Sequence, residues 1–200
     1  MKKPDIISGI RNITVSGRIA SGASTLATHL SETLGWKFLN GGALFREFTA
    51  ENGLDIVYTS TRPDQFDLEY EEKIKKIIKE KSNYVIQSHL AAFDAQGIEG
   101  VFKILVVCED AEGVDKIEIR IDRLVNRDGK KVEDAKVEIL ERERQNLEKW
   151  RRLYANNNQN WVYWDKKYYD CIINTYSLNT EESIKAVLDS IWNQQEPKHI

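Results

Sequence analysis

Short apolar runs recur along the chain and are separated by longer stretches of mixed character. Each run is rich in Val, Ile, Phe or Trp and lacks the three- or four-residue spacing of a helix, which is typical of buried strands. We therefore predict strands over residues 12–16, 36–40, 84–89, 102–108 and 170–175.

The stretches between these runs show helical periodicity. Leu26, Leu30 and Leu34 lie at helical intervals and are followed by Gly35, a common residue at a helix end. Comparable patterns predict further helices over residues 43–53, 66–81, 114–129, 132–154 and 180–194. Asn179 can cap the last helix, with Glu182 three residues later as in a capping box.

Strands that alternate with helices indicate an α/β fold with a parallel sheet covered on both faces. Residues 55–65 read as a loop because Pro63 interrupts any helix, and residues 156–164 are polar and aromatic without periodicity. The last six residues read as a frayed tail. No internal repeat is present.

Composition narrows the class of protein. A chain of 200 residues, 41% hydrophobic and 30% charged, is typical of one globular domain. The net charge of −3 does not favour a nucleic-acid partner, and no run reaches the roughly 18 apolar residues of a membrane span. We expect a cytoplasmic protein in which Cys108 and Cys171 are buried free thiols.

The turn after the first strand carries the clearest chemical signal. Phosphate-binding loops follow the pattern G-x-x-x-x-G-K-S/T, in which glycines let backbone N–H groups approach an anion at the start of a helix. Gly17 and Gly22 have this spacing and Ser24 fills the hydroxyl position, but Ala23 replaces the lysine. The predicted nucleotide-binding residues are Gly17, Arg18, Ser21, Gly22, Ala23, Ser24 and Thr25, with Ser24 as the Mg²⁺ ligand.

Four segments in order give the chain a wider resemblance. They are "ITVSGRIASGASTLATHLSETLGWKF", "LNGGALFREF", "VIQSHLAA" and "ILERERQNLEKWRRLY" with the later "YYDCIINT". Over about residues 12–193 the chain resembles the cytidylate kinases of the short archaeal and bacterial type, within the P-loop nucleoside monophosphate kinases. The resemblance implies a three-layer α/β/α P-loop NTPase fold with a five-stranded parallel sheet.

The resemblance also implies a division of the single domain. The core comprises residues 12–40, 83–127 and 166–193. A helical insertion that binds the acceptor covers about residues 41–82, and a lid covers about residues 128–165. We expect the lid to be loosely packed without ligand, with Trp161 and Trp164 folded back against the domain.

The implied reaction transfers the γ-phosphoryl group of ATP, with Mg²⁺, to CMP or dCMP. Arg46 matches the family arginine that holds the acceptor phosphate, a task that suits a bidentate guanidinium. Basic residues in and near the lid would clamp the transferred phosphoryl group. The candidates are Arg123, Arg127, Arg142 and Lys149, the last two seven residues apart and hence on one helical face.

Several positions depart from the family pattern. Ala23 lacks the loop lysine, Ala43 stands where an acid is usual, His89 stands where an arginine contacts the acceptor, and Lys149 replaces an arginine. Arg18 is a candidate to replace the missing loop charge. These departures leave three interpretations open: a weakened cytidylate kinase, a kinase of another small acceptor, and a nucleotide-binding protein without catalysis.

Overall fold

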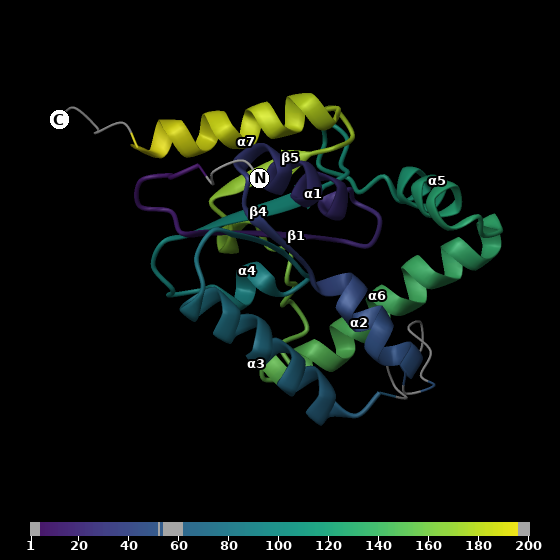
Figure 1. Cartoon of the computed structure of the whole chain (residues 1–200). Helices are drawn as coiled ribbons and strands as arrows, with labels where there is room; N and C mark the ends of the chain where they lie inside the picture. The colour runs from purple at the N-terminus through teal and green to yellow at the C-terminus, as the bar shows by residue number, and fades with distance from the viewer. Residues whose placement is uncertain (1–4, 52, 54–61, 196–200) are drawn as a thin grey trace.

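The computed structural model describes residues 5–51, 53 and 62–195, and its centre is a parallel sheet (Figure 1). The strands are β1 (Asn12–Gly17), β2 (Lys37–Asn40), β3 (Tyr84–Gln87), β4 (Val101–Val107) and β5 (Cys171–Asn174). They lie in the order β2-β3-β1-β4-β5, and every pair is parallel. The predicted five-stranded parallel α/β fold is therefore confirmed.

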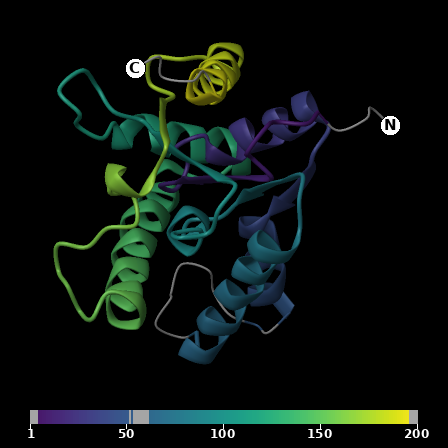
Figure 2. The same cartoon turned by 90° about the vertical axis from the view of Figure 1, so that its left-hand side faces the viewer.

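Helices cover both faces of this sheet. They are α1 (Ala23–Leu34), α2 (Gly41–Glu51), α3 (Asp64–Glu80), α4 (Ala91–Asp94), α5 (Ile117–Asp128), α6 (Val132–Tyr154) and α7 (Thr180–Gln195). The apolar faces of α1 and α7 bury one side of the sheet, and α3 and α4 bury the other. Figure 1 shows α5 to the right of the sheet and α6 running diagonally from it across the lower half of the molecule, and Figure 2 gives the same fold from the side.

The helix boundaries differ from the sequence predictions mainly at starts. Helix α3 begins at Asp64, directly after Pro63, because proline is compatible with a helix start although it breaks a helix interior. Most of the predicted loop at 55–65 lies outside the described residues, as does most of the predicted C-terminal tail. The predicted capping box of α7 is confirmed by reciprocal bonds between Asn179 and Glu182 of 2.9 and 3.0 Å.

The lid region is packed more closely than its sequence predicts. Trp161 and Tyr163, from the irregular segment after α6, are 7% and 2% exposed and form a cluster with Trp150 and Leu90. Rings of Phe93 and Trp161 meet edge to face with centroids 5.3 Å apart. Trp161 therefore does fold back against the domain, as predicted, but it enters an aromatic core rather than a loose surface.

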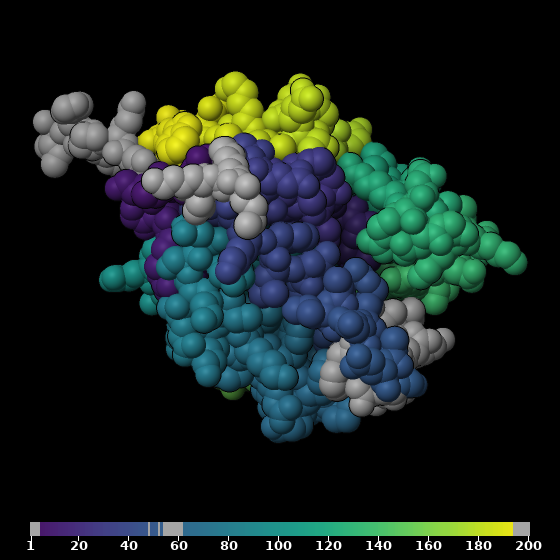
Figure 3. Space-filling model, viewed as in Figure 1, coloured from purple at the N-terminus to yellow at the C-terminus, as the bar shows by residue number. Residues whose placement is uncertain are grey.

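The surface view places α7 over α1, with α5 and the start of α6 at the right-hand side (Figure 3). Cys108 and Cys171 are buried free thiols, as predicted.

Among the described residues, no helix combines the length and apolar character needed to cross a bilayer.

Two buried carboxyl groups meet between α3 and α4. Burial and the nearby charge of Asp94 raise the pKa of Glu71, and burial raises the pKa of Asp94 to about 6. A hydrogen bond links the two side chains. The neutral form is thus favoured at this contact, because a second negative charge in a dry site is costly.

From this contact between Glu71 and Asp94 we predict that the free energy of unfolding declines as the pH rises. A carboxyl whose pKa is raised by folding stabilises the native state below its unfolded pKa, near 3.8 for Asp94, and loses that contribution as the pH passes about 6. We expect the free energy of unfolding to fall by on the order of 2–3 kcal/mol between pH 4 and 7. Asp94→Asn should flatten this dependence in urea titrations.

Asp122→Asn is the matched control, since Asp122 is an exposed carboxylate on α5. Its unfolding curve should keep the pH dependence of the unaltered chain. Parallel curves for all three proteins would contradict the assignment of the pH dependence to the Glu71–Asp94 contact.

Candidate functional site

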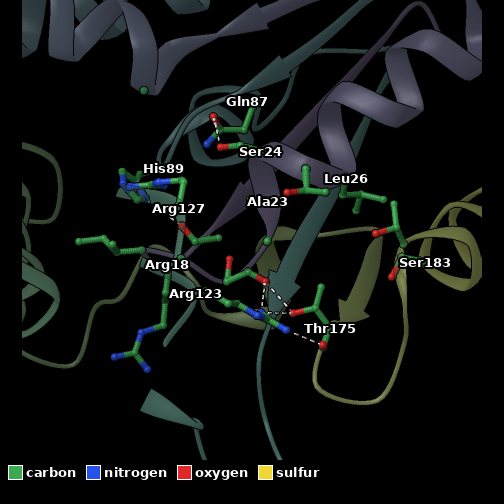
Figure 4. Close-up of a pocket in the computed structure, with 18 of the residues that line it drawn as sticks. Arg18, Ala23, Ser24, Leu26, Gln87, His89, Arg123, Arg127, Thr175 and Ser183 are labelled. Atoms are coloured by element: carbon green, nitrogen blue, oxygen red, sulfur yellow. Dashed lines mark hydrogen bonds between the residues drawn. The ribbon is translucent and has the colours of Figure 1, made fainter. Parts of the chain in front are cut away.

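A cavity of about 620 Å³ opens at the carboxyl end of β1, bounded by the phosphate loop, α5, α6 and the loop after β5 (Figure 4). Its volume is within the range of sites that bind nucleotides and other small molecules. Ligands bind at this end of the strands in open α/β sheets. The candidate site therefore lies at the edge of the sheet where ligands bind in this class of fold.

The phosphate loop presents free backbone donors to this cavity. Gly22 has a φ of +100° and precedes α1 without a side-chain cap. Leu26 N is the first helical N–H to bond back, to Gly22 O at 3.0 Å, so donors of the first turn face the cavity. Gly17 is required because a Cβ there would lie 2.8 Å from Val106 O. This geometry suits an anionic group.

Ser24 lies at the start of α1, where its hydroxyl bonds Gln87 Oε1 at 3.1 Å. Figure 4 shows this contact at the cavity wall. A hydroxyl oxygen is a hard ligand of the kind Mg²⁺ prefers, so the residue present fits the ion. No carboxylate is among the described residues that line the cavity, so the nucleotide's phosphates would have to complete the coordination.

Arginines from three helices converge on the cavity. Arg46 comes from α2, Arg127 from α5 and Arg142 from α6. Burial and the charge of Arg127 lower the pKa of Arg46, and burial lowers the pKa of Arg142 against the opposing charge of Glu138. Asp128 and Glu138 act on Arg46 in the opposite sense, but more weakly. Like charges held together in this way favour a polyanionic ligand.

Arg18 does not fold over the phosphate site. Its guanidinium bonds Glu143 at 2.6 Å, pairs with Asp115 at 3.3 Å and lies 4.5 Å from the ring centre of Trp164. Arg120 contacts the same two carboxylates, at 2.6 and 2.9 Å. Arg18 thus belongs to a charge-balanced network while also lining the cavity.

Glu143 also accepts a bond from Ile19 N at 3.2 Å, inside the phosphate loop. Burial opposes its ionisation, but hydrogen bonds from Arg120 and Arg18 outweigh burial and lower the pKa of Glu143. The carboxylate therefore stays charged at neutral pH. It joins the lid helix to the loop by ionic hydrogen bonds.

His89 lies just after β3 and faces the loop from the other side. Its Nδ1 is 2.8 Å from Gly17 O, and its ring packs against Trp150 and Tyr163. Burial and the charge of Arg142 lower the pKa of His89 to about 4. The imidazole is therefore neutral near pH 7, and it does not supply the positive charge of the family arginine.

Most of the predicted site residues line the same cavity. They are Gly17, Arg18, Ser21, Gly22, Ala23, Ser24, Thr25, Arg46, His89, Arg123, Arg127 and Arg142. Arg123 lines it while bonding Ser21 O and Thr175, which ties α5 to the loop (Figure 4).

Two predicted residues lie elsewhere, which corrects the expected arrangement. Lys149 Nζ is 2.5 Å from Asp67 and bonds Arg62 O at 2.6 Å. It shares a helix face with Arg142, but two turns place it about 10 Å further along the axis. Ala43 is outside the cavity, and its N–H bonds Asn40 Oδ1 at 2.9 Å.

Sequence reasoning missed Gln87, Glu143 and Thr175. Glu143 is one acid in the run "ERERQ", which looks like a solvated helix face. In the structure it is 7% exposed and buried together with Arg142 and Gln145, whereas Arg144 of the same run is exposed. Thr175 follows the last strand, and that position at the carboxyl edge of the sheet could have indicated it.

A second, narrow cavity of about 30 Å³ adjoins the first, on the side of the predicted acceptor insertion. Phe45, Arg62 and Tyr70 line it from the insertion, and Trp150 closes it from α6. Gly42, Gln87, His89 and Arg142 line both cavities and so stand between them.

Comparisons with known proteins agree with this arrangement. A family described as AAA domain matches residues 16–140. The chain is 31% identical to the cytidylate kinase of Natronomonas pharaonis over 188 residues, covering 92% of this chain and 91% of that protein. It is 33% identical to the cytidylate kinase of Thermococcus kodakarensis over 186 residues, covering 90% and 88%.

Solved structures share the fold at low sequence identity. An uncharacterized protein from Eubacterium ventriosum superposes with a TM-score of 0.61 at 14% identity, covering 90% of this chain and 98% of that one. Shikimate kinase from Acinetobacter baumannii gives 0.55 at 15% identity, covering 94% and 96%. With these structures and its curated relatives, the chain belongs to the cytidylate kinase family of P-loop kinases.

Proposed function

We propose that this protein is a nucleoside monophosphate kinase that transfers the γ-phosphoryl group of ATP to CMP or dCMP. The observation that carries the proposal is the cavity shared by the phosphate loop and Arg46, Arg127 and Arg142. The curated relatives named cytidylate kinase support the substrate class.

Phosphoryl transfer needs positioning and neutralisation of charge more than covalent chemistry. The loop N–H groups would hold the donor's phosphates, and Arg46 would hold the acceptor's phosphate. Arg142, 7% exposed beside His89, would contact the group in transfer. These arginines place positive charge in the region that a loop lysine would serve, although Ala23 has none.

Mg²⁺, when bound with the nucleotide, would neutralise part of the phosphate charge, and Ser24 would hold it. The packed lid serves the same chemistry because Trp150, Trp161 and Tyr163 exclude water from the side of the cavity beyond His89.

A kinase of another small acceptor is the second candidate. His89 is neutral and Ala43 lies outside the cavity, so neither offers the charged contact expected of a cytidylate kinase acceptor site. Two structural neighbours are titled shikimate kinase and gluconokinase, at TM-scores of 0.55. Measuring ADP formation with a panel of nucleoside monophosphates, shikimate and gluconate tests both candidates. Nucleotide binding without turnover on any of them would favour a non-catalytic binder.

Nucleotide binding should depend on Gly22. Gly22→Val places a branched side chain at a φ of +100° and brings its Cβ within 3.2 Å of Thr175. Because the loop must then change shape, calorimetry should show no ADP binding at millimolar ligand. Gly113→Val is the control, since Gly113 also has positive φ, +79°, but has open space around it. Equal loss of ADP binding in both variants would contradict the loop assignment.

Turnover should depend on Arg142. Arg142→Ala removes a cation from the cavity, and we expect kcat/KM for CMP to fall roughly 100-fold, as for loss of a donor that stabilises transition-state charge. Arg144→Ala is the matched control, because Arg144 is exposed on the same helix and pairs with Glu141 and Glu148. If steady-state kinetics show the two variants equally active, Arg142 has no role in transfer.

A further inference from the structure

The hydrogen bond between His89 and Gly17 defines the protonation of the imidazole. A backbone carbonyl only accepts, so at 2.8 Å the ring nitrogen Nδ1 must carry the hydrogen and donate it to Gly17 O. In a neutral imidazole the other nitrogen, Nε2, then has a free lone pair. Within the described part of the chain, Nε2 has no hydrogen-bond partner.

The ring is held in this orientation from several sides. Trp150 of α6 and Tyr163 of the following segment lie with their ring centres 5.8 and 5.5 Å from the imidazole. The Tyr163 hydroxyl is 3.2 Å from Nδ1, on the same side as Gly17 O. The free lone pair is therefore fixed relative to the phosphate loop.

The charged groups around the ring favour its neutral form. Arg142 of α6 and Arg46 of α2 oppose protonation, and Glu143 of α6 and the Gly17 carbonyl favour it more weakly than burial opposes it. The imidazole is therefore an acceptor over the whole neutral range, whereas an arginine at this position could only donate.

His89 also lies between the two cavities. It is a lining residue of the phosphate cavity and of the narrow cavity on the side of the acceptor insertion. A group at such a boundary is placed between donor and acceptor. On the premise of the proposed function, that boundary is where the acceptor oxygen meets the γ-phosphorus.

We propose that His89 is a catalytic base that accepts a hydrogen bond at Nε2 from a protonated acceptor oxygen and takes its proton during transfer. An ionised acceptor oxygen has no hydrogen to donate to the lone pair of Nε2. The ionised form of the acceptor is therefore disfavoured at this position. His89 thus selects the protonation state of the acceptor.

The acceptor O–H bond breaks and its proton passes to Nε2, while the acceptor oxygen bonds the γ-phosphorus and the bond from that phosphorus to the bridging oxygen of ATP breaks, releasing ADP. The phosphates of the bound donor offset the charges of Arg142 and Arg46. This makes Nε2 a stronger base when the nucleotide is present.

Two acceptors share this chemistry. One is the monoanionic form of a nucleoside monophosphate, whose phosphate keeps one proton below a pKa of about 6. The other is a sugar or alcohol hydroxyl. The same cavity would serve both, and they differ in how binding depends on pH.

Binding of CMP and of cytidine to the full chain, saturated with ADP, should be measured by calorimetry between pH 5 and 8. Selection of the monoanion predicts that CMP affinity falls about tenfold per pH unit above pH 6. His89→Arg should reverse this trend, because a guanidinium prefers the dianion. His29→Asn is the control, since His29 is an exposed histidine on α1, and it should leave the trend unchanged.

Phosphorylation of cytidine but not CMP would support the base with a hydroxyl as the acceptor. CMP affinity that is flat or rises above pH 6 in the unaltered chain, with no cytidine phosphorylation, would overturn the proposal. So would failure of both ligands to bind.

Nitrogen NMR of the unaltered protein gives a readout that does not need turnover. The His89 resonances, assigned through their loss in His89→Asn, should show Nδ1 protonated and Nε2 unprotonated at pH 7. The opposite tautomer or a charged ring overturns the proposal. A correct tautomer and CMP pH dependence without phosphoryl transfer would instead count against the proposed function alone.

Discussion

The buried carboxylate of Glu143 organises the candidate site. It accepts from Arg18, Arg120 and Ile19 N, so one side chain of α6 joins the phosphate loop to α5. Leaving such donors unpaired in a buried place would cost several kcal/mol, on the order of 3–5 for a broken buried ion pair. Glu143 therefore ties α6 to the phosphate loop at one wall of the cavity.

This constraint changes how the missing loop lysine is understood. Because Glu143 and Asp115 neutralise Arg18, the nearest cation in sequence is not available to phosphate. Arg46, Arg127 and Arg142 also line the cavity, from three separate helices, and of these Arg127 pairs with Asp128 at 2.7 Å and Arg142 with Glu138 at 3.3 Å. A charge-assisted contact contributes about 1.5–3 kcal/mol, so these side chains together can supply what one lysine would.

The acceptor side shows the complementary change. His89 replaces an expected arginine and contributes a neutral acceptor, held by Gly17 O and by an aromatic cluster. The aromatic segment after α6, which has no periodicity in sequence, supplies Tyr163 to that cluster. The loss of an arginine and the aromatic character of this segment therefore belong to one structural feature.

Local patterning was enough for much of this protein. Apolar runs and helical spacing predicted the strands and the α7 cap, because these depend on neighbours within a few residues. The alternation of strands with helices predicted the parallel sheet. The glycine spacing likewise located the phosphate loop, and the family resemblance located Arg46 and Arg142 in its cavity. Helix α4 was not predicted, because its four residues are too few to show helical periodicity.

The tertiary structure decided which charges face the cavity. Arg142 and Lys149 are both basic and lie on the same face of α6. Arg142 lines the phosphate site, whereas Lys149, two turns away, pairs with Asp67. Arg18 and Glu143 are 125 residues apart, and their pairing depends on how α6 crosses the loop. Electrostatic partnership is set by distance in three dimensions and by burial, and neither quantity is written in the spacing of residues along a chain.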